Sequence, residues 1–265
     1  DIRIQRMLRS YAKEDPPPNR VKPVPIAVLR RIFAISACTQ CAHSACLADM
    51  IGLAFFFLLR PGEYTHSSQD SVPFELKDVQ LFQGTPRLDL ITATDAQLLA
   101  ASFGSLTFDT QKNAVRGEVI GQGHSGDPNL SPTKILARRV IHLRSHGAPP
   151  NTPLSSYYDA RGTLQHIKPA HITAALQDAV RFLNPTVLGF LPSDVTARCL
   201  RAAGANALLS AQVDSDHIRL LGRWRSDEML RYLHLQAQPI MHRFASLMLA
   251  GGNFVLIPNQ QVPSY

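Results

Sequence analysis

Arg198-Cys199-Leu200-Arg201 is followed along the chain by Leu221-Gly222-Arg223-Trp224 and then by Tyr232, which lies eight residues beyond the tryptophan. The guanidinium group of arginine keeps its charge at physiological pH, and its planar fork matches the geometry of a phosphate. A tyrosine hydroxyl can act as a nucleophile that forms a covalent intermediate. Several arginines grouped with one tyrosine therefore indicate a site that binds a phosphodiester through the arginines and attacks it with the tyrosine hydroxyl.

This stretch is predicted to form three short helices. A short polar side chain at the start of a helix satisfies backbone N–H groups that otherwise have no partner. The candidate caps are, in chain order, Ser193 or Asp194, Asp214 or Ser215, and Ser226 or Asp227. Because Arg198 and Arg201 are three residues apart on the first of these helices, we expect their side chains to lie on one face of it.

Two further motifs lie upstream. Leu58-Leu59-Arg60-Pro61-Gly62-Glu63 ends an apolar segment, residues 44–59, that is predicted to be a buried helix, so Arg60 is expected at a helix end with its head group in a cleft. Phe108-Asp109-Thr110-Gln111-Lys112-Asn113 lies between two strand candidates, residues 105–108 and 117–120, which places Lys112 at a β-hairpin tip. Taken alone, Arg60 could equally face solvent or pair with Glu63, and a lysine at a hairpin tip is usually just solvated.

These motifs, in this order, resemble the catalytic domain of the tyrosine recombinases, also called phage-type integrases. The resemblance covers roughly residues 25 to 235, and the Arg-Pro-Gly-Glu and Gly-Arg-Trp wording is most similar to recombinases of eukaryotic mobile elements. It implies a mostly α fold with a small antiparallel β-sheet. It also implies site-specific DNA recombination, as in integration or transposition, in which strands are cleaved and rejoined without metal, ATP or another cofactor.

The resemblance assigns a role to each motif. Arg60 and Arg201 clamp the scissile phosphate, and Tyr232 attacks it to give a 3′-phosphotyrosine and a free 5′-hydroxyl. Lys112 protonates the departing oxygen, and Trp224 donates its indole N–H to the phosphate. Tyr232 and Trp224 are also compatible with ordinary core aromatic residues. The predicted catalytic residues are Arg60, Lys112, Arg198, Arg201, Trp224 and Tyr232, and the predicted DNA-contacting residues are Arg219, Arg223 and Arg225.

Arg198 departs from the family pattern, which usually has histidine at this position. An arginine cannot remove the proton of the tyrosine. Either the site uses a third cation, while phosphate, water or another residue takes the proton, or catalysis is lost and DNA binding remains. Hairpin-telomere resolvases, which are relatives with similar chemistry, look to have a basic residue other than histidine here, and this favours activity. A relaxing enzyme similar to type IB topoisomerases, without target specificity, is a third possibility.

The composition agrees with a DNA-binding protein. The chain has 27 Lys and Arg against 20 Asp and Glu, which gives a formal net charge of +7. Such a balance indicates a polyanionic partner, here double-stranded DNA, on which we expect a homo-oligomer between a dimer and a tetramer. The longest apolar run, residues 51–59, is too short to cross a bilayer, and no signal peptide precedes it. We expect an intracellular protein, nuclear if the host is eukaryotic.

Proline marks a domain boundary near the N-terminus. Asp15-Pro16-Pro17-Pro18-Asn19 cannot continue a helix and is expected to be a stiff linker. We expect residues 1–20 to be this linker plus the trailing edge of a DNA-clamping domain that is otherwise absent, and residues 21–250 to form the catalytic domain. Residues 251–265 are expected to form a tail that docks on a neighbouring subunit or packs in cis.

Apolar periodicity predicts further helices over residues 25–37, 132–144 and 172–182, and further strands over residues 78–82 and 87–93. Cys38, Cys41 and Cys46 invite comparison with a zinc site. They lie between two apolar helical patterns without a Gly or Pro to form a knuckle. Reduced cysteines packed in helices are therefore the favoured interpretation.

Overall fold

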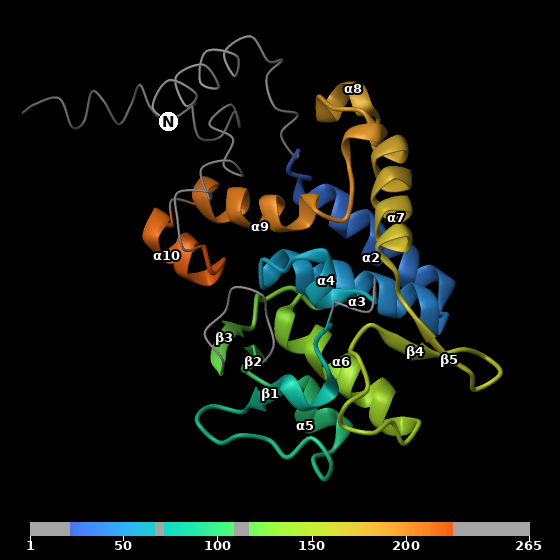
Figure 1. The fold of residues 1–265 in the computed structure, drawn as a ribbon, viewed down its shortest axis with the longest axis vertical. Coiled ribbons are helices and arrows are strands. Elements are labelled where there is room, and N and C mark those ends of the chain that lie inside the picture. The colour runs from blue at the N-terminus through green and yellow to red at the C-terminus, as the bar shows by residue number, and fades with distance from the viewer. Residues whose placement is uncertain (1–21, 67–71, 109–116, 212, 225–265) are drawn as a thin grey trace, which may run out of the picture.

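The structure is a computed structural model that describes residues 22–66, 72–108, 117–211 and 213–224. Helix α3 (Ala42–Phe56) runs through the middle of these residues, and α2 (Ile26–Thr39), α6 (Pro132–Ser145), α7 (Pro169–Phe182) and α9 (Cys199–Ser210) pack around it (Figure 1). Small antiparallel sheets flank the helices. The fold is mostly α with small antiparallel β-sheets, as the sequence predicts.

The central place of α3 follows from its composition. All of its residues from Cys46 to Phe55 are buried except Leu47, and a helix that is apolar on every side needs neighbours on every side. The helix ends at Phe56, earlier than the predicted end at residue 59, and Leu58 then adopts a left-handed conformation with φ of +50°. The chain turns there, and Arg60 precedes the short helix α4 (Pro61–Tyr64).

The other long helices agree with the predictions at their centres and differ at their ends. Helix α7 begins at Pro169, three residues before the predicted start at residue 172. Proline at the first position of α6 and α7 costs no hydrogen bond, because the N–H groups of a first turn have no partner within the helix. The remaining short helices are α5 (Asp95–Leu99), α8 (Pro185–Leu188) and α10 (Ser215–Leu221).

Helix α9 does not begin where the sequence predicts. Ser193 and Asp194 belong to a separate 3₁₀ turn, η2 (Pro192–Asp194), in which the Asp194 carboxylate accepts the backbone N–H of Leu191 at 2.9 Å. Arg198 is instead the N-cap of α9. The prediction of a cap at Ser193 or Asp194 is therefore wrong, because that carboxylate closes a different turn.

The cap of α10 is confirmed. The Asp214 side chain accepts the backbone N–H of Asp216 at 2.8 Å, at the start of the helix. Ser226 and Asp227, the candidate caps of the next helix, lie outside the described residues.

Three strands form the larger sheet, in the order β1 (Val79–Phe82), β2 (Phe103–Phe108) and β3 (Glu118–Gly123), and a 3₁₀ turn, η1 (Leu76–Asp78), precedes it. The predicted strands at residues 78–82, 105–108 and 117–120 are confirmed. Strands β2 and β3 pair from Phe103 with Gly123 to Phe108 with Glu118, so the segment that carries Lys112 connects two paired strands. A second sheet, formed by β4 (Ser156–Tyr158) and β5 (Leu164–His166), is not predicted by the sequence.

Residues 87–93 do not form the predicted strand. Arg87 pairs with Phe82 only as an isolated bridge. Nη1 of Arg144 in α6 donates hydrogen bonds to the carbonyl oxygens of Leu90 and Ala93, at 3.0 and 2.6 Å. A side chain thus satisfies backbone groups that a strand partner would otherwise satisfy, which the local sequence pattern cannot reveal.

The cysteines differ in exposure. Cys46 is buried in α3, where burial raises its pKa to about 12, whereas Cys38 and Cys41 are exposed near the turn between α2 and α3. Within the described ranges, no group of three His, Cys, Asp or Glu side chains is placed to hold a metal ion. No described helix combines the length and apolarity needed to span a membrane.

Candidate active site

Arg60 stands at the N-cap of α4, where the chain leaves the turn after α3. Its backbone N–H donates to Oε2 of Glu63 at 2.9 Å, and its Nη1 donates to Oε1 of the same carboxylate at 3.1 Å. The Glu63 side chain is 8% exposed, whereas that of Arg60 is 39% exposed. One carboxylate therefore holds Arg60 by both backbone and side chain, and the guanidinium still reaches solvent.

Tyr64 joins α4 to the start of α9. Its side chain is buried, and its hydroxyl donates to the backbone carbonyl of Ala197, 133 residues away, at 2.9 Å. Burial raises the pKa of Tyr64, with Cys199 and Glu63 acting in the same direction, so the phenol remains a donor. This contact joins α4 to Ala197, the residue that precedes Arg198.

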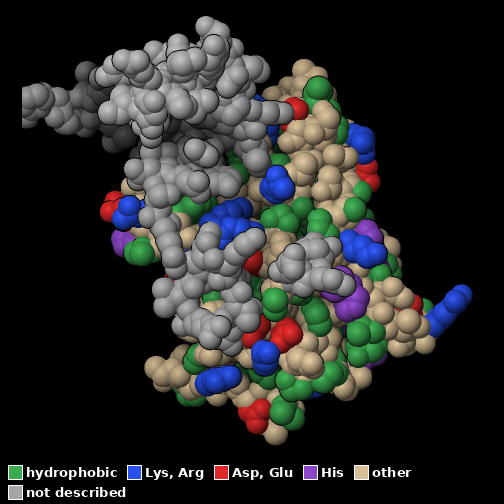
Figure 2. All heavy atoms as spheres, in the orientation of Figure 1, with side chains coloured by type: hydrophobic (Ala, Val, Ile, Leu, Met, Phe, Trp, Pro, Cys, Tyr) green, Lys and Arg blue, Asp and Glu red, His purple; other side chains and the backbone are tan. Residues whose placement is uncertain are grey.

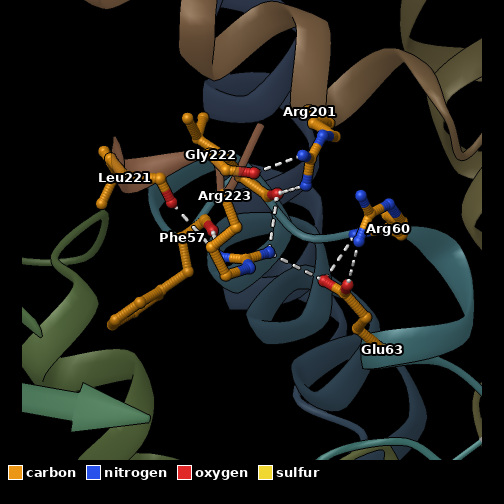
Figure 3. Close-up of polar contacts among 8 residues, drawn as sticks. Phe57, Arg60, Glu63, Arg201, Leu221, Gly222 and Arg223 are labelled. Carbon is orange, nitrogen blue, oxygen red and sulfur yellow. Dashed lines mark hydrogen bonds and ion pairs between the residues drawn. The ribbon is translucent and has the colours of Figure 1, made fainter. Parts of the chain in front are cut away.

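Arg201 is enclosed, with 3% of the residue exposed. Its Nη1 donates to the carbonyl oxygen of Leu58 at 2.6 Å, and its Nη2 donates to that of Gly222 (Figure 3). The guanidinium carbon lies 4.1 Å from the ring centre of Trp224, which is also buried. Arg201 thus joins the turn before Arg60 to the Gly-Arg-Trp motif.

Arg223 points inward. Its side chain is 4% exposed, and its Nη2 forms an ion pair with Oε2 of Glu63 at 3.0 Å. Its Nη1 donates to the carbonyl oxygens of Phe57 and Leu221, at 3.3 and 3.2 Å (Figure 3). Burial lowers the pKa of Arg223, while the charge of Glu63 acts in the opposite direction. The guanidinium therefore faces a carboxylate and carbonyl groups, and the DNA-contacting role that the sequence suggests for Arg223 stays a prediction.

Arg198 and Arg219 are more accessible. Arg198 is exposed at the N-cap of α9, and Arg219 in α10 is partly exposed and pairs with Asp216 at 3.3 Å. Arg198 and Arg201 do not share the common environment expected of one helix face. Arg198 caps the helix instead of lying within it, so the spacing rule for helix interiors does not apply to it.

Three predicted site residues, Lys112, Arg225 and Tyr232, lie outside the described residues. The structure therefore places Arg201 against Trp224 and against the turn that precedes Arg60, while Arg198 follows Ala197, whose carbonyl oxygen binds Tyr64 of α4.

Positive charge concentrates at this site. Arg60, Arg201 and Arg223 surround the turn at residues 57–58, and the Glu63 carboxylate is hydrogen-bonded to Arg60 and Arg223. Figure 2 shows Lys and Arg side chains exposed near the middle of one face of the molecule. Guanidinium groups fixed in this way can stabilise negative charge that develops on phosphate oxygens, without a metal ion.

Glu63 and Tyr64 are parts of this cluster that the sequence does not assign to the site. Glu63 has a local signal, because a Glu three residues after an N-cap is the pattern of a capping box. Its second partner, Arg223, is 160 residues away and carries no such signal. Tyr64 has none either, because its acceptor is a backbone carbonyl.

No protein-family model and no curated protein matches this sequence. Among solved structures, 17 chains match the fold. One is the crystal structure of XerA recombinase, with a TM-score of 0.50 and 13% sequence identity over 88% of this chain and 66% of that chain. This chain thus spans about two thirds (66%) of the length of that recombinase. At this identity the likeness shows the fold alone, and the described residues resemble the tyrosine recombinase fold.

Proposed function

We propose that this chain is a site-specific DNA recombinase that cleaves and rejoins strands through a 3′-phosphotyrosine intermediate. The observation that carries the proposal is the meeting of two distant arginine motifs: Nη1 of Arg201 donates to the carbonyl of Leu58, two residues before Arg60, at 2.6 Å. Both motifs belong to the ordered set that resembles the tyrosine recombinases, and the fold agrees with that set. Their meeting supports a shared phosphate-binding role.

The proposed reaction needs no metal ion and no ATP. The Tyr232 oxygen attacks phosphorus and loses its proton, the bond from phosphorus to the 5′-oxygen breaks, and the departing oxygen takes a proton from Lys112. The phosphotyrosine conserves the energy of the broken linkage, so a 5′-hydroxyl of another strand can reverse the step. Arg60 and Arg201 stabilise the charge that builds on the nonbridging oxygens, and Trp224 donates its indole N–H.

Arg198 acts in this scheme as a third cation. Its exposed position at the N-cap of α9, next to the Ala197 carbonyl held by Tyr64, supports a place close to Arg60. Since an arginine does not act as a base, the tyrosine proton passes to water or to a phosphate oxygen. The positive charge of Arg198 then stabilises the phenolate and the transition state.

The same residue supports the second candidate function, a DNA-binding module without catalysis. A site that binds phosphate through arginines and lacks a base retains its affinity for DNA but does not cleave the strand. Sequence-independent relaxation of DNA, as in type IB topoisomerases, is a third outcome of the same arginine and tyrosine chemistry.

Covalent trapping separates these functions. The chain is incubated with duplexes that have a randomised core and a nick within it, so that the short 5′-hydroxyl fragment diffuses away and the adduct accumulates. Sequencing of the captured strands gives the target, and mass spectrometry of the nucleotide-linked peptide gives the attachment residue. Tyr232→Phe is the test variant, and Tyr158→Phe, on strand β4, is the matched control.

The proposal expects an adduct with the wild type and with Tyr158→Phe, and none with Tyr232→Phe. Tight DNA binding without an adduct at any pH would identify the catalysis-free module. An adduct that persists in Tyr232→Phe would show that the nucleophile is another residue. Relaxation of supercoiled plasmid without sequence preference would identify a topoisomerase-like enzyme.

The finer assignments belong to the same proposal. The Arg-Pro-Gly-Glu and Gly-Arg-Trp motifs support a recombinase of a eukaryotic mobile element, which would act in the nucleus on double-stranded DNA during integration or transposition. Exchange of two strands between two duplexes needs more than one nucleophile, which supports assembly of a dimer to a tetramer on DNA.

A further inference from the structure

We propose that Arg223 is a positioning residue, which holds Arg60 and Arg201 in place through Glu63 and the carbonyl of Leu58 and does not itself contact DNA. The inference rests on the proposed function only for its catalytic readout. It is carried by the contacts of the described residues around the turn at residues 57–60.

Glu63 connects Arg223 to Arg60. Oε2 of Glu63 accepts the backbone N–H of Arg60 at 2.9 Å and Nη2 of Arg223 at 3.0 Å, while Oε1 accepts Nη1 of Arg60 at 3.1 Å. A carboxylate that is 8% exposed needs a buried counter-charge, and Arg60 is too exposed to serve alone. The Glu63 conformation that accepts both hydrogen bonds from Arg60 therefore depends on Arg223.

Leu58 connects Arg223 to Arg201. The carbonyl oxygen of Leu58 accepts Nη1 of Arg201 at 2.6 Å and Nη2 of Arg223 at 3.4 Å, and that of Phe57 accepts Nη1 of Arg223 at 3.3 Å. Leu58 has φ of +50°, a conformation that residues with a side chain rarely adopt unless their surroundings impose it. The two arginines impose it here, and the turn so formed delivers Arg60.

Arg223 is itself fixed from other sides. Its guanidinium carbon lies 4.0 Å from the ring centre of Phe108, the last residue of β2, and its Nη1 also donates to the carbonyl of Leu221. With 4% of its side chain exposed, Arg223 could reach a DNA phosphate only by leaving Glu63. A lysine would keep the charge but not the planar fork that serves a carboxylate and two carbonyls together.

The salt dependence of DNA affinity shows whether Arg223 positions other residues or contacts a phosphate itself. An arginine that neutralises a phosphate releases counterions, so its loss lowers the slope of log affinity against log salt by about 1. An arginine buried against Glu63 in the free protein releases none. If Arg223 is a positioning residue, its loss therefore slows adduct formation and leaves the slope of log affinity against log salt (the salt slope) unchanged.

The test compares Arg223→Lys, which keeps the charge, Arg223→Gln, which removes it, Glu63→Gln, and the double variant Arg223→Lys/Glu63→Gln with Arg139→Lys. Arg139 is the matched control, because it is also buried and donates from Nε to the carbonyl of Leu154 at 3.0 Å, outside the arginine cluster. For each variant, the rate of adduct formation on the trapped target, the DNA affinity across a salt series and the free energy of unfolding are measured.

We expect Arg223→Lys and Glu63→Gln each to form the adduct at least about 10-fold more slowly, Arg223→Gln to leave the salt slope unchanged, and the double variant to be no slower than the slower single one. Arg139→Lys lowers stability without this loss of rate. The inference is overturned if Arg223→Lys keeps the wild-type rate within about twofold, if the salt slope of Arg223→Gln falls by about 1, or if Arg139→Lys loses as much rate.

A wild type that forms no adduct would contradict the proposed function and still leave this inference testable. In that case Arg60→Ala is combined with Arg223→Lys, and DNA affinity is the readout. Positioning predicts that the loss of DNA affinity caused by Arg60→Ala shrinks at least about threefold once Arg223 is changed, because Arg60 then keeps its charge near the phosphate but no longer directs its hydrogen bonds to it. If the losses of DNA affinity caused by the two substitutions are strictly additive, the inference is overturned.

Discussion

A buried arginine is stable only where its charge and its N–H groups find partners. The Nη groups of Arg201 and Arg223 find them in the carbonyl groups of residues 57, 58, 221 and 222 and in Glu63, while Nε of Arg223 is buried without a hydrogen-bond partner among the described residues. Arg60 and Arg198 instead remain accessible to solvent. In this account buried Arg223 supports the turn before Arg60, while Arg60, Arg198 and Arg201 act on the scissile phosphate.

Substituting Arg198→His tests the cationic role of this residue. A histidine is charged only below its pKa, which is ordinarily about 6.5, so a cation at this position would be lost as the pH rises from 6 to 8. We expect the adduct rate of the variant to fall by about 10-fold over this range relative to the wild type, with little change in DNA affinity. The measurement is single-turnover adduct formation against pH.

Two other outcomes of that experiment would contradict this role. A rate that rises with pH would mean that the new histidine serves as a base. A large loss of DNA affinity with unchanged chemistry would mean that Arg198 contributes to binding and not to catalysis.

At the residue scale, the sequence predicts those parts of the site that short motifs carry. Arg60 and Arg201 are recognised from their neighbours in the chain, and the structure joins them through Leu58. The inward orientation of Arg223 is not predictable in this way, because its partner Glu63 lies 160 residues away. Tyr64 is missed for the same reason, since it binds a backbone carbonyl.

At the scale of elements, the site depends on the close crossing of α3 and α9. Gly204 of α9 faces the end of α3, and a Cβ atom there would lie 2.2 Å from the carbonyl oxygen of Phe55 and 2.4 Å from Cδ2 of Leu58. The side chain could move, but the backbone carbonyl could not without shifting α3. Because α9 carries Arg201, any such shift would separate the two arginine motifs.

Gly204→Ala is therefore expected to lower the free energy of unfolding by at least about 2 kcal/mol, as overpacking against backbone does. Gly123→Ala is the control, because the nearest atom to its Cβ would be the carbonyl oxygen of Ser102 at 4.0 Å. Urea unfolding of both variants checks the prediction. A Gly204→Ala protein within about 0.5 kcal/mol of the wild type would show that the crossing is looser than described.

The contact between α6 and β4 makes stability depend on pH. Nε2 of His142 accepts the backbone N–H of Tyr158 at 3.1 Å, and burial, with smaller contributions from Arg139 and His146, lowers the pKa of His142 to about 4. A histidine with a lowered pKa stabilises the folded state above its unfolded pKa of about 6.5. This contribution is lost as the pH falls from 6.5 towards 4.

We expect His142→Gln to flatten this dependence. Between pH 7 and pH 4.5 the wild type should lose about 1 kcal/mol more unfolding free energy than the variant, a value reduced for the partial exposure of the ring. His43 and His166, whose pKa values are also lowered by burial, contribute equally to both proteins, so the difference isolates His142. Equal slopes in urea unfolding would contradict the prediction.

Helices and strands were predictable from the sequence where the residues of the segment itself determine its secondary structure. The periodicity of α2, α6 and α7 and the alternation of β1 and β2 suffice to identify them. The false strand at residues 87–93 and the misplaced cap of α9 have another cause: Arg144 and the η2 turn satisfy those backbone groups from outside the local pattern.

At the scale of the whole molecule, a net charge of +7 favours association with DNA, and α3 acts as the common support of the site. Its C-terminal end supplies the turn at residues 57–58, which binds Arg201 of α9 and Arg223 after α10. The order of motifs predicted the fold class, because that order reflects the whole topology. It did not predict that a single turn would join the motifs, since this depends on how helices pack.

The most direct measurement of the central claim, that Arg60 neutralises charge on the scissile phosphate, replaces one nonbridging oxygen of that phosphate by a methyl group. The neutral methylphosphonate develops less negative charge during attack, so it needs the arginine less. On the mapped target we expect Arg60→Ala to form the adduct about 100-fold more slowly than the wild type with the natural phosphate, and within about fivefold of it with the methylphosphonate. Arg181→Ala, an exposed arginine with an acidic partner three residues away, should match the wild type on both. An equal deficit of Arg60→Ala on the two substrates would contradict the account.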